Sequence, residues 1–292
     1  MILKELQSLV QNKIILKKKK YTVIIGADPS KTARSPILWN YFFKKTNQNI
    51  EMIPLDTDKK NIKKILEILS KDNKFLGGCV AVPFKENIYH ELLKKKALDK
   101  ITQQIGAVNC IYKNKNKIFG TNTDGEAAIK VFNNKFGNIR NKKCLILGYG
   151  GVGKAVTAFF NNATKRKIII SNRTKINKNI ISKNNLEFIE WKKFPTILSK
   201  MDIIINCTSL GFDKNRKSPL KKKEFYFIKN NVYLFDVIYN PLETTFLKLG
   251  KKRSRNFLNG LEMNKMQAIL AIKKVLKNKF SANIIKRKLE KF

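Results

Sequence analysis

The sequence predicts an α/β fold whose second part is a doubly wound, nucleotide-binding domain. Two observations lead to this prediction. Short apolar stretches alternate with helical stretches along most of the chain, and a Gly-rich turn follows directly after the apolar stretch at residues 143–147. Alternation of this kind is typical of mostly parallel sheets, because each helix returns the chain to the same edge of the sheet.

The first half of the chain contains four predicted strands, with helices of the length that parallel connections need. Ahead of them, residues 1–20 form an N-terminal extension with an amphipathic helix and a run of lysines. The predicted strands are residues 21–25, 50–54, 78–82 and 107–112, and the predicted helices are residues 36–45, 61–70 and 84–95.

The second half contains the nucleotide-binding pattern. We place the first domain at residues 21–125 and the second at residues 126–260, with a helix from Glu126 to about Phe136 leading from one to the other. Two C-terminal helices within residues 261–292 are expected to pack back on the first domain. The strands predicted for the second sheet are residues 143–147, 167–170, 202–206 and 232–236.

The composition excludes several classes of protein. A chain of 292 residues supplies about two domains, and 43% hydrophobic with 28% charged residues is the balance of a folded globular protein. One histidine and four scattered cysteines leave no metal-binding cluster, and no serine lies in the G-x-S-x-G turn of a triad hydrolase. With no run of about 20 apolar residues and no signal peptide, we expect a cytoplasmic protein that binds no membrane.

The charge is strongly positive, with 61 Lys and Arg against 21 Asp and Glu and a net charge of +40. An excess of this size suggests an anionic partner. The lysines are spread over nearly every segment, however, usually beside Asn and Ile, and these three residue types have AT-rich codons. We therefore attribute the charge to genome composition and expect no specific nucleic-acid partner, only a general attraction of anionic ligands.

The Gly-rich turn has the spacing of a dinucleotide-binding loop. Residues 148–153 match G-x-G-x-x-G between a strand and an apolar helix. In such loops Gly148 permits a tight turn, Gly150 lets the backbone approach a pyrophosphate, and Gly153 allows close helix packing. The helix N-terminus at Gly151 then attracts the phosphates. The alternative is a turn with a purely structural role.

The end of the next strand predicts which dinucleotide binds. An NAD-binding domain places a carboxylate there for the ribose 2′-hydroxyl, whereas this chain has Asn172, Arg173 and Thr174 and no acidic residue. The guanidinium of Arg173 suits a phosphate, with Asn172 and Thr174 as further donors. We therefore predict NADP rather than NAD. The alternative for Arg173 is one more surface cation of a basic protein.

Two segments of the first domain place polar groups just past strand ends. Lys85 follows a Val-Pro pair, and Asp124 lies in the Gly-flanked loop 120–125. Ligands of open α/β sheets bind at the carboxyl ends of strands, so both residues are well placed for chemistry.

These segments resemble the signature blocks of the shikimate dehydrogenase family, NADP-dependent enzymes that interconvert 3-dehydroshikimate and shikimate in aromatic amino-acid and chorismate biosynthesis. The resemblance spans about residues 21–270. It implies a substrate-binding domain, an NADP-binding domain of Rossmann type and a cleft between them. We expect a monomer or homodimer with a small-molecule substrate. The further blocks lie, in the family's order, at residues 26–36, 106–109, 148–153, 172–174, 206–211, 236–244 and 259–267.

The resemblance also implies roles for individual residues. Lys85 becomes the acid/base that exchanges a proton with the substrate hydroxyl, and Asp124 holds the ammonium and the hydroxyl in register. The alternative is a structural ion pair, which would cost desolvation energy. For Asn109, Gln267 and Tyr239 the alternatives are a loop cap, a solvated helix face and a core ring. The implied substrate contacts are Ser35, Asn109, Tyr239 and Gln267, and the implied further cofactor contacts are Thr208 and Gly260.

Four positions depart from the family pattern. Ala33, Cys79 and Ala81 stand where the family has two hydroxyl side chains and an amide, and Glu262 replaces a small residue. A site built to bond a hydroxyl loses about 1 to 3 kcal/mol per missing partner. Two alternatives therefore stay open. One is a family member with a shifted substrate, such as quinate, aminoshikimate or another cyclic hydroxy-acid; the other is a non-catalytic dinucleotide-binding protein.

Overall fold

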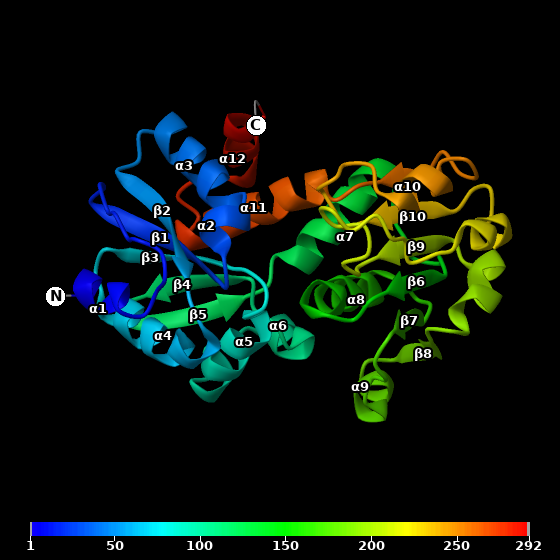
Figure 1. The fold of residues 1–292 in the computed structure, drawn as a ribbon, viewed down its shortest axis with the longest axis horizontal. Helices are drawn as coiled ribbons and strands as arrows, with labels where there is room; N and C mark the ends of the chain where they lie inside the picture. Colours follow the sequence, from blue (N-terminus) through cyan, green and yellow to red (C-terminus); the bar gives the residue numbers. More distant parts are fainter. Residues whose placement is uncertain (1, 291–292) are drawn as a thin grey trace. The chain divides into compact units, whose positions relative to one another are not determined.

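The computed structural model describes residues 2–290, which form two compact units (Figure 1). Unit 1 combines the residues up to Thr123 with those from Met266 onward, and unit 2 is Asp124–Lys265. The chain thus enters unit 2 next to the loop 120–125 and leaves it inside the long helix α11 (Leu261–Val275).

Unit 1 is built on a five-stranded sheet with the order β2-β1-β3-β4-β5. Strands β1 (Lys20–Gly26), β2 (Ile50–Asp56) and β3 (Phe75–Val80) are parallel, as predicted, so their carboxyl ends share one edge of the sheet. Strand β4 (Cys110–Asn114) is antiparallel to β3 and to β5 (Lys117–Thr121). The predicted mostly parallel pairing holds for β1, β2 and β3 but not for β4, which runs antiparallel to β3. Strand β5, which was not predicted, forms a hairpin with β4.

Two predicted strands of unit 1 lie at shifted positions. The stretch 78–82 belongs to β3 only as far as Val80, and Val82 is 72% exposed. The stretch 107–112 begins its strand only at Cys110. In both cases the apolar run continues into a loop that carries candidate site residues, which explains why hydrophobicity alone misplaced the boundary.

Helices cover both faces of this sheet, which makes unit 1 a three-layer structure (Figure 1). On one face, Leu6 and the apolar stripe of α4 pack against Val23 and Leu55. On the other, Trp39 and Phe42 share one apolar cluster with the C-terminal helices. Burial of each such side chain contributes about 1.5–3 kcal/mol. The first face carries α1 (Ile2–Gln7), α4 (Ile62–Lys71) and α5 (Lys85–Lys94); the second carries α3 (Ser35–Lys45), α11 and α12 (Ala282–Leu289); α2 (Pro29–Thr32), η1 (Lys59–Asn61) and α6 (Lys100–Ile105) lie in the connections.

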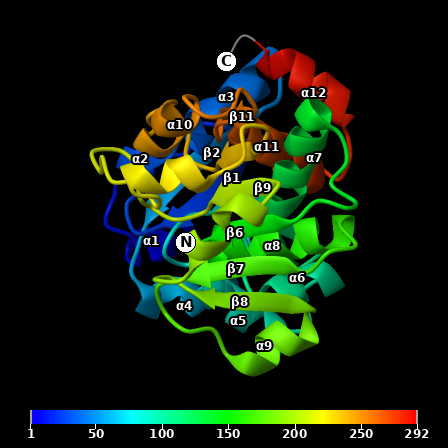
Figure 2. The ribbon, with the colours of Figure 1, turned by 90° about the vertical axis from the view of Figure 1, so that its right-hand side faces the viewer.

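Unit 2 contains a parallel six-stranded sheet with the order β11-β10-β9-β6-β7-β8. Counted from β6, this is the strand order 3-2-1-4-5-6 of the dinucleotide-binding fold, and it confirms the predicted doubly wound architecture. Figure 2 shows β6, β7 and β8 side by side. The chain changes direction across the sheet between β6 and β9. The strands are β6 (Cys144–Leu147), β7 (Ile168–Asn172), β8 (Leu186–Glu190), β9 (Ile203–Asn206), β10 (Tyr233–Asp236) and β11 (Phe257–Leu258).

Helices α7 and α8 pack closely in unit 2. A Cβ built on Gly125 would lie 2.3 Å from the carbonyl oxygen of Ala155, so glycine is required where the two helices approach. Phe132 of α7 contacts Phe160 of α8 and Phe235 of β10. The helices of this unit are α7 (Asp124–Phe136), α8 (Gly151–Ala163), α9 (Lys178–Lys183), η2 (Phe194–Lys200), η3 (Lys222–Phe227) and α10 (Thr245–Gly250).

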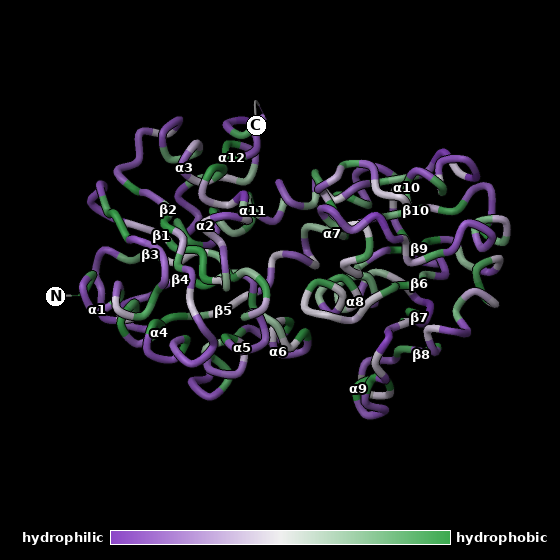
Figure 3. Tube along the Cα trace, viewed as in Figure 1, coloured by the Kyte–Doolittle hydropathy of each residue, from purple (hydrophilic) through white to green (hydrophobic). Residues whose placement is uncertain are grey.

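Hydropathy follows the layers of each unit. Figure 3 shows hydrophobic residues along the strands and hydrophilic residues along the outer loops. Three cysteines, Cys79, Cys110 and Cys144, are buried as free thiols. None of the helices among the described residues has the length and apolar character needed to cross a bilayer.

Candidate active site

The loops at the carboxyl ends of the parallel strands of unit 1 fix the backbone around Lys85. The amide of Ala81 donates to the carbonyl oxygen of Ile25 at 2.8 Å, which continues the β1–β3 pairing past the end of β3. Lys85 is the first residue of α5 and is half-buried. Its carbonyl oxygen accepts from the amide of Val108 at 2.9 Å. Lys85 is therefore tied to the segment that leads into β4.

Asn109 links this segment to the end of β5. Its Oδ1 accepts from the amide of Thr123 at 2.7 Å, and its Nδ2 donates to Thr123 Oγ1 at 3.0 Å. Asn122 adds a bond from its Nδ2 to the carbonyl oxygen of Ala107 at 2.9 Å. Asn109, Asn122 and Thr123 are all buried, so these bonds replace the water that their polar groups lose. Asp124 is the next residue, also buried, and it begins α7.

Gln267 belongs to the same cluster through its backbone. Thr123 Oγ1 donates to the Gln267 carbonyl oxygen at 3.2 Å, and the Gln267 side chain is half-buried. Unit 1 thus brings two predicted substrate contacts, Asn109 and Gln267, together around Thr123. Thr123 itself was not predicted as a site residue, although its place in the Gly-flanked loop 120–125 was the available signal.

Two predicted pairs have one residue in each unit: the substrate-carboxylate pair Ser35 and Tyr239, and the catalytic pair Lys85 and Asp124. Ser35 begins α3 in unit 1, whereas Tyr239 follows β10 in unit 2. The Tyr239 ring packs edge-on against Phe212, with 6.3 Å between the ring centroids. Lys85 belongs to unit 1 and Asp124 begins unit 2. The joint action of each pair stays a prediction.

Three of the four departures from the family pattern lie in or against one apolar cluster. Cys79 is one of the buried members of the apolar cluster around Trp39, and Ala33 and Ala81 pack against that cluster. A Cβ built on Gly26 would lie 3.0 Å from the Cβ of Ala81, so β1 passes close by. The three small or apolar side chains thus extend the core toward the edge of the sheet where ligands bind in this fold class.

The Gly-rich loop has the backbone geometry that a dinucleotide site needs. Gly148 has a φ of +95°, and its amide donates to the carbonyl oxygen of Ser171 at 2.8 Å. A Cβ on Gly153 would lie 2.1 Å from the Gly148 carbonyl oxygen, whereas a Cβ on Gly150 would meet nothing within 4 Å. Gly148 and Gly153 are therefore needed by the fold, and Gly150 keeps the backbone approachable ahead of α8, which begins at Gly151.

Asn172 connects this loop to the residues after β7. Its Oδ1 accepts from the amide of Tyr149 at 3.1 Å, and its Nδ2 donates to the carbonyl oxygen of Thr174 at 3.0 Å. The side chains of Arg173 and Thr174 are exposed. The sequence predicted that Asn172 donates a hydrogen bond to a phosphate. In the structure its side chain links the Gly-rich loop to the residues after β7, which sequence spacing does not reveal.

A buried carboxylate orients the loop after β9. Asp236 is fully buried and accepts bonds from Asn206 Nδ2 at 3.1 Å and Thr244 Oγ1 at 2.6 Å. Asn206 Oδ1 in turn accepts from Thr208 Oγ1 at 2.7 Å. Burial raises the pKa of Asp236 to about 6, against the opposing effect of its hydrogen bonds. The sequence predicted no role for Asp236, although this residue lies in one of the matched blocks.

Gly260 is required by a close backbone approach. A Cβ at this position would lie 2.0 Å from the carbonyl oxygen of Val237, and the Gly260 amide donates to the carbonyl oxygen of Ile238 at 2.9 Å. The predicted cofactor residue Gly260 thus holds the start of α11 against the loop after β10. Its contact with a cofactor stays a prediction.

The features of unit 2 fit a phosphorylated dinucleotide. The Gly-rich loop lies after β6, next to the point where the strand order reverses, and a Cβ on Gly148 would lie 2.9 Å from Thr208 Cγ2 of the loop after β9. The exposed cation Arg173 follows β7, at the position where an acidic residue would favour NAD. Among residues 2–290, no group of three or more His, Cys, Asp or Glu side chains is arranged to hold a metal ion.

The sequence and structure match known proteins over most of the chain. Two family models match, the shikimate dehydrogenase substrate binding domain at residues 24–111 and shikimate / quinate 5-dehydrogenase at residues 130–226. A shikimate dehydrogenase (NADP(+)) of Methanosphaera stadtmanae is 33% identical over 267 residues, which cover 88% of this chain and 92% of that protein. The corresponding protein of Methanocaldococcus jannaschii is 35% identical over 265 residues, which cover 88% and 91%.

A solved structure supports the same assignment. The crystal structure of a shikimate dehydrogenase in complex with NADP+ is 29% identical and matches with a TM-score of 0.81. The match covers 96% of this chain and 97% of that one. The resemblance found in the sequence is therefore confirmed, and the chain belongs to the shikimate dehydrogenase family.

Proposed function

We propose that this protein is an NADP-dependent shikimate dehydrogenase that interconverts 3-dehydroshikimate and shikimate. The observation that carries the proposal is the cluster of Asn109, Thr123 and Gln267 beside the backbone of Lys85, built at the carboxyl ends of the strands of unit 1. Relatives that share about a third of its residues over most of the chain carry this name. Unit 1 then binds the substrate and unit 2 binds the dinucleotide.

When bound, NADPH would supply the hydride that reduces the carbonyl carbon. The backbone at Gly150 and the N-terminus of α8 bind the pyrophosphate, and Arg173 binds the 2′-phosphate. Asn172 holds the Gly-rich loop and the 172–174 segment at a fixed distance through its two hydrogen bonds. Asp236 and Asn206 hold the Thr208 side chain beside Gly148, where it would contact the dinucleotide.

Lys85 moves the proton. Its ammonium gives a proton to the substrate oxygen as the hydride arrives, and its amine takes that proton back in the oxidative direction. Asp124, placed directly after the anchored Thr123, positions the ammonium. Asn109, which its two bonds to Thr123 hold in place, donates from its amide to a ring hydroxyl of the substrate. Gln267 binds another hydroxyl, and Ser35 with Tyr239 receives the substrate carboxylate.

A family member with a shifted substrate is the second candidate. The apolar corner formed by Ala33, Cys79 and Ala81 favours it, because the two hydroxyl side chains and the amide of the family pattern are missing there. We further propose a cytoplasmic monomer or homodimer with no specific nucleic-acid or membrane partner.

One assay separates these candidates. The absorbance of NADPH is followed with 3-dehydroshikimate, and the reduction of NADP+ is followed with shikimate and with quinate in parallel. We expect turnover with shikimate and little with quinate. Preferred turnover of quinate supports the shifted substrate, and no turnover of any cyclic hydroxy-acid with intact NADPH binding contradicts both.

A further inference from the structure

The N-terminal extension is built into unit 1, although the match to the substrate binding domain begins only at residue 24. Leu6 of α1 is fully buried, and Leu9 and Val10 pack against the same apolar cluster. Strand β2 is an outer strand of the sheet, so one row of its backbone groups has no strand partner. The extension supplies hydrogen-bond partners for part of that row.

The side chain of Asn12 takes the place of a strand partner at the end of β2. Its Nδ2 donates to the carbonyl oxygen of Pro54 at 3.0 Å, and its Oδ1 accepts from the amide of Asp56 at 2.8 Å. The amide of Gln11 donates to the carbonyl oxygen of Asp56 at 2.8 Å. Both backbone groups of Asp56 are thus bonded to the extension, which fixes the strand end from which the Asp56 side chain extends.

The side chain of Asp56 holds the loop between β1 and α3. We call residues 27–34, which end just before Ser35, the substrate loop. Asp56 Oδ1 accepts from the amide of Ser30 at 2.9 Å, and its Oδ2 accepts from the Ser30 hydroxyl. Asp56 is only 4% exposed, so these bonds replace the water that the buried carboxylate loses. Both oxygens of the carboxylate thus bond one residue of the substrate loop.

The substrate loop depends on such anchors. It contains the four-residue helix α2 (Pro29–Thr32), which is too short to be stable by itself. The loop is also tied at its start, where the carbonyl oxygen of Gly26 accepts from the amide of Thr57 at 2.9 Å. Thr57 is bonded to the extension in turn, because its Oγ1 donates to the carbonyl oxygen of Leu9 at 2.7 Å. Residues 56 and 57 therefore connect the extension to the substrate loop.

We propose that Asn12 and Asp56 are positioning residues for the reaction and act through the substrate loop. The extension holds the end of β2, Asp56 holds Ser30, and Ser30 sets the place of the turn that leads into Ser35. The inference rests on the proposed function, in which Ser35 receives the substrate carboxylate. Lys85 lies on a different loop, after β3. Disturbing these contacts should therefore weaken substrate binding and leave the chemical step largely intact.

Two variants of Asp56 test the contact with the loop. Asp56→Ala removes both acceptors of Ser30, whereas Asp56→Asn keeps an acceptor for the Ser30 amide and can donate to the Ser30 hydroxyl. We expect Asp56→Ala to raise the KM for 3-dehydroshikimate about ten-fold, with kcat within about three-fold of the natural value and the Kd for NADPH unchanged. Asp56→Asn should stay within about three-fold of the natural KM. An unchanged KM in a folded Asp56→Ala variant, or equal rises in both variants, overturns the proposal.

Ser30→Ala gives a second measure of the same contact and leaves the core unchanged. Ser30 is exposed, so this variant loses only the hydroxyl bond to Asp56 and should fold. We expect the KM to rise about two- to five-fold. In combination with Asp56→Ala the change should add little, because both substitutions remove one contact. Rises that multiply in the double variant would mean that the two residues act separately, which contradicts the proposal.

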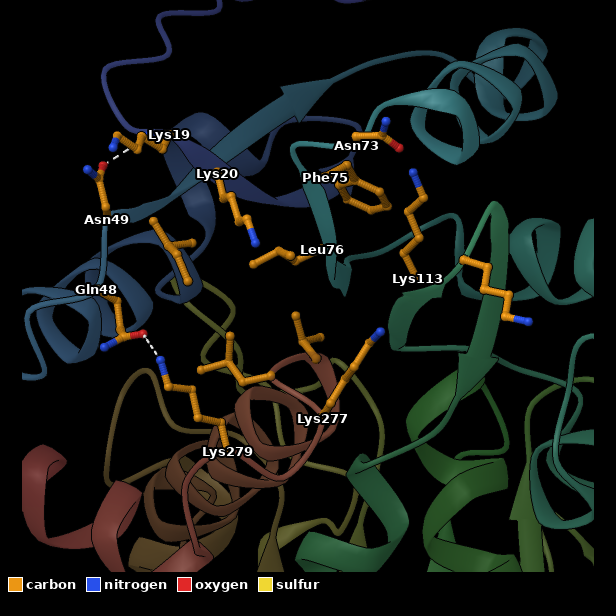
Figure 4. Close-up of a pocket in the computed structure, with 14 residues that line it drawn as sticks. Lys19, Lys20, Gln48, Asn49, Asn73, Phe75, Leu76, Lys113, Lys277 and Lys279 are labelled. Atoms are coloured by element: carbon orange, nitrogen blue, oxygen red, sulfur yellow. Dashed lines mark hydrogen bonds between the residues drawn. The ribbon is translucent and has the colours of Figure 1, made fainter.

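Asn12→Ala tests the extension, with Asn49→Ala as the matched control. Asn49 also joins the extension to the sheet, but just before the amino end of β2, where its Oδ1 accepts from the amide of Lys19 at 2.9 Å. Figure 4 shows this bond at the wall of a cavity. We expect Asn12→Ala to raise the KM about three- to ten-fold and Asn49→Ala to change it less than about two-fold. Equal rises would mean that any loosening of the extension has the same effect, which contradicts the proposal.

Hydrogen exchange distinguishes failure of this inference from failure of the proposed function, because it needs no substrate. Peptides that cover residues 27–34 should exchange about five-fold faster or more in Asp56→Ala and Asn12→Ala, while peptides that cover residues 109–123 keep their rates. Circular dichroism establishes that each variant folds. If the natural protein does not turn over 3-dehydroshikimate, the proposed function fails, and the exchange still decides whether the extension holds the loop. Unchanged loop exchange in the folded variants contradicts the inference whatever the activity.

Discussion

The side chain of Asn109 holds Thr123 through both of its polar atoms. Its Oδ1 accepts from the Thr123 amide at 2.7 Å, and its Nδ2 donates to the Thr123 hydroxyl at 3.0 Å. Because Asp124 is the next residue, this clamp fixes the backbone from which a proposed catalytic side chain extends. The Thr123 hydroxyl also donates to the Gln267 carbonyl oxygen, so one amide side chain organises three segments of unit 1.

Truncation of this clamp should affect both stability and catalysis. Asn109→Ala leaves the buried amide and hydroxyl of Thr123 with fewer partners, at a cost of about 1–3 kcal/mol for each unsatisfied group. Asn109→Asp keeps the acceptor for the Thr123 amide but loses the Nδ2 donor to the Thr123 hydroxyl, so it should cost less stability than Asn109→Ala while raising the KM for shikimate. Urea unfolding and steady-state kinetics measure the two effects. An Asn109→Ala variant as stable as the natural protein would show that the clamp is dispensable.

Two glycines of the Gly-rich loop should respond in opposite ways. Gly153→Ala places a Cβ 2.1 Å from the Gly148 carbonyl oxygen, so α8 must shift and the free energy of unfolding should fall by about 1–3 kcal/mol. Gly150→Ala meets nothing within 4 Å, so stability should be preserved while NADPH affinity falls. Thermal unfolding and NADPH fluorescence titration measure the pair. Normal NADPH binding by Gly150→Ala contradicts the assigned pyrophosphate position.

Arg173 should decide between the two dinucleotides. Arg173→Ala removes a charge-assisted contact with the 2′-phosphate, worth about 1.5–3 kcal/mol, so NADPH affinity should fall about 10- to 100-fold. NADH affinity should change little, because NADH has no phosphate at that position. Lys175→Ala, an exposed cation two residues away, serves as the control. Equal losses for NADPH and NADH would remove the assignment.

Asp236 should make the stability depend on pH. Its pKa is raised to about 6 by burial, above the value of about 3.9 in an unfolded chain, so the folded state binds more protons between these values. As the pH rises through this window, the free energy of unfolding should fall by up to about 3 kcal/mol. Asp236→Asn carries no titrating group, so its stability relative to the natural protein should rise over the same window.

Urea unfolding between about pH 4 and pH 8 measures this difference, because the contributions of other groups cancel between the two proteins. The amide oxygen of an asparagine at position 236 still accepts from Asn206 and Ile238, which keeps the loop after β9 in place. A stability difference that is constant with pH would mean that Asp236 does not titrate in this window.

The sequence predicted most of the strands that position the site, because buried parallel strands read as apolar runs. The strands that it missed lie at sheet edges. Strand β8 has two glutamates among its five residues, and β11 has only two residues. Strand β5 contains Gly120, where a Cβ would lie 2.7 Å from Leu92, so a glycine needed for packing inside a strand was interpreted as part of a loop.

Sequence motifs identified the predicted site residues. They did not identify the residues that hold those site residues in place. Gly148 and Gly153 have recognisable spacing, whereas the bond from Tyr149 to Asn172 depends on how two loops meet in space. Asp236 and Thr123 lay inside matched blocks, but only burial and bonding partners reveal what they do. Spacing along the chain encodes local turns, and contacts between distant loops need the fold.

The most direct test concerns the proton-transfer role of Lys85. The kcat for reduction of 3-dehydroshikimate and the Kd for NADPH are measured for the natural protein, for Lys85→Ala and for Lys95→Ala, an exposed lysine at the end of α5. Loss of the general acid should lower kcat about 10²–10⁴-fold in Lys85→Ala with NADPH binding unchanged, while Lys95→Ala retains normal turnover. Near-normal kcat in Lys85→Ala would contradict the proposed mechanism.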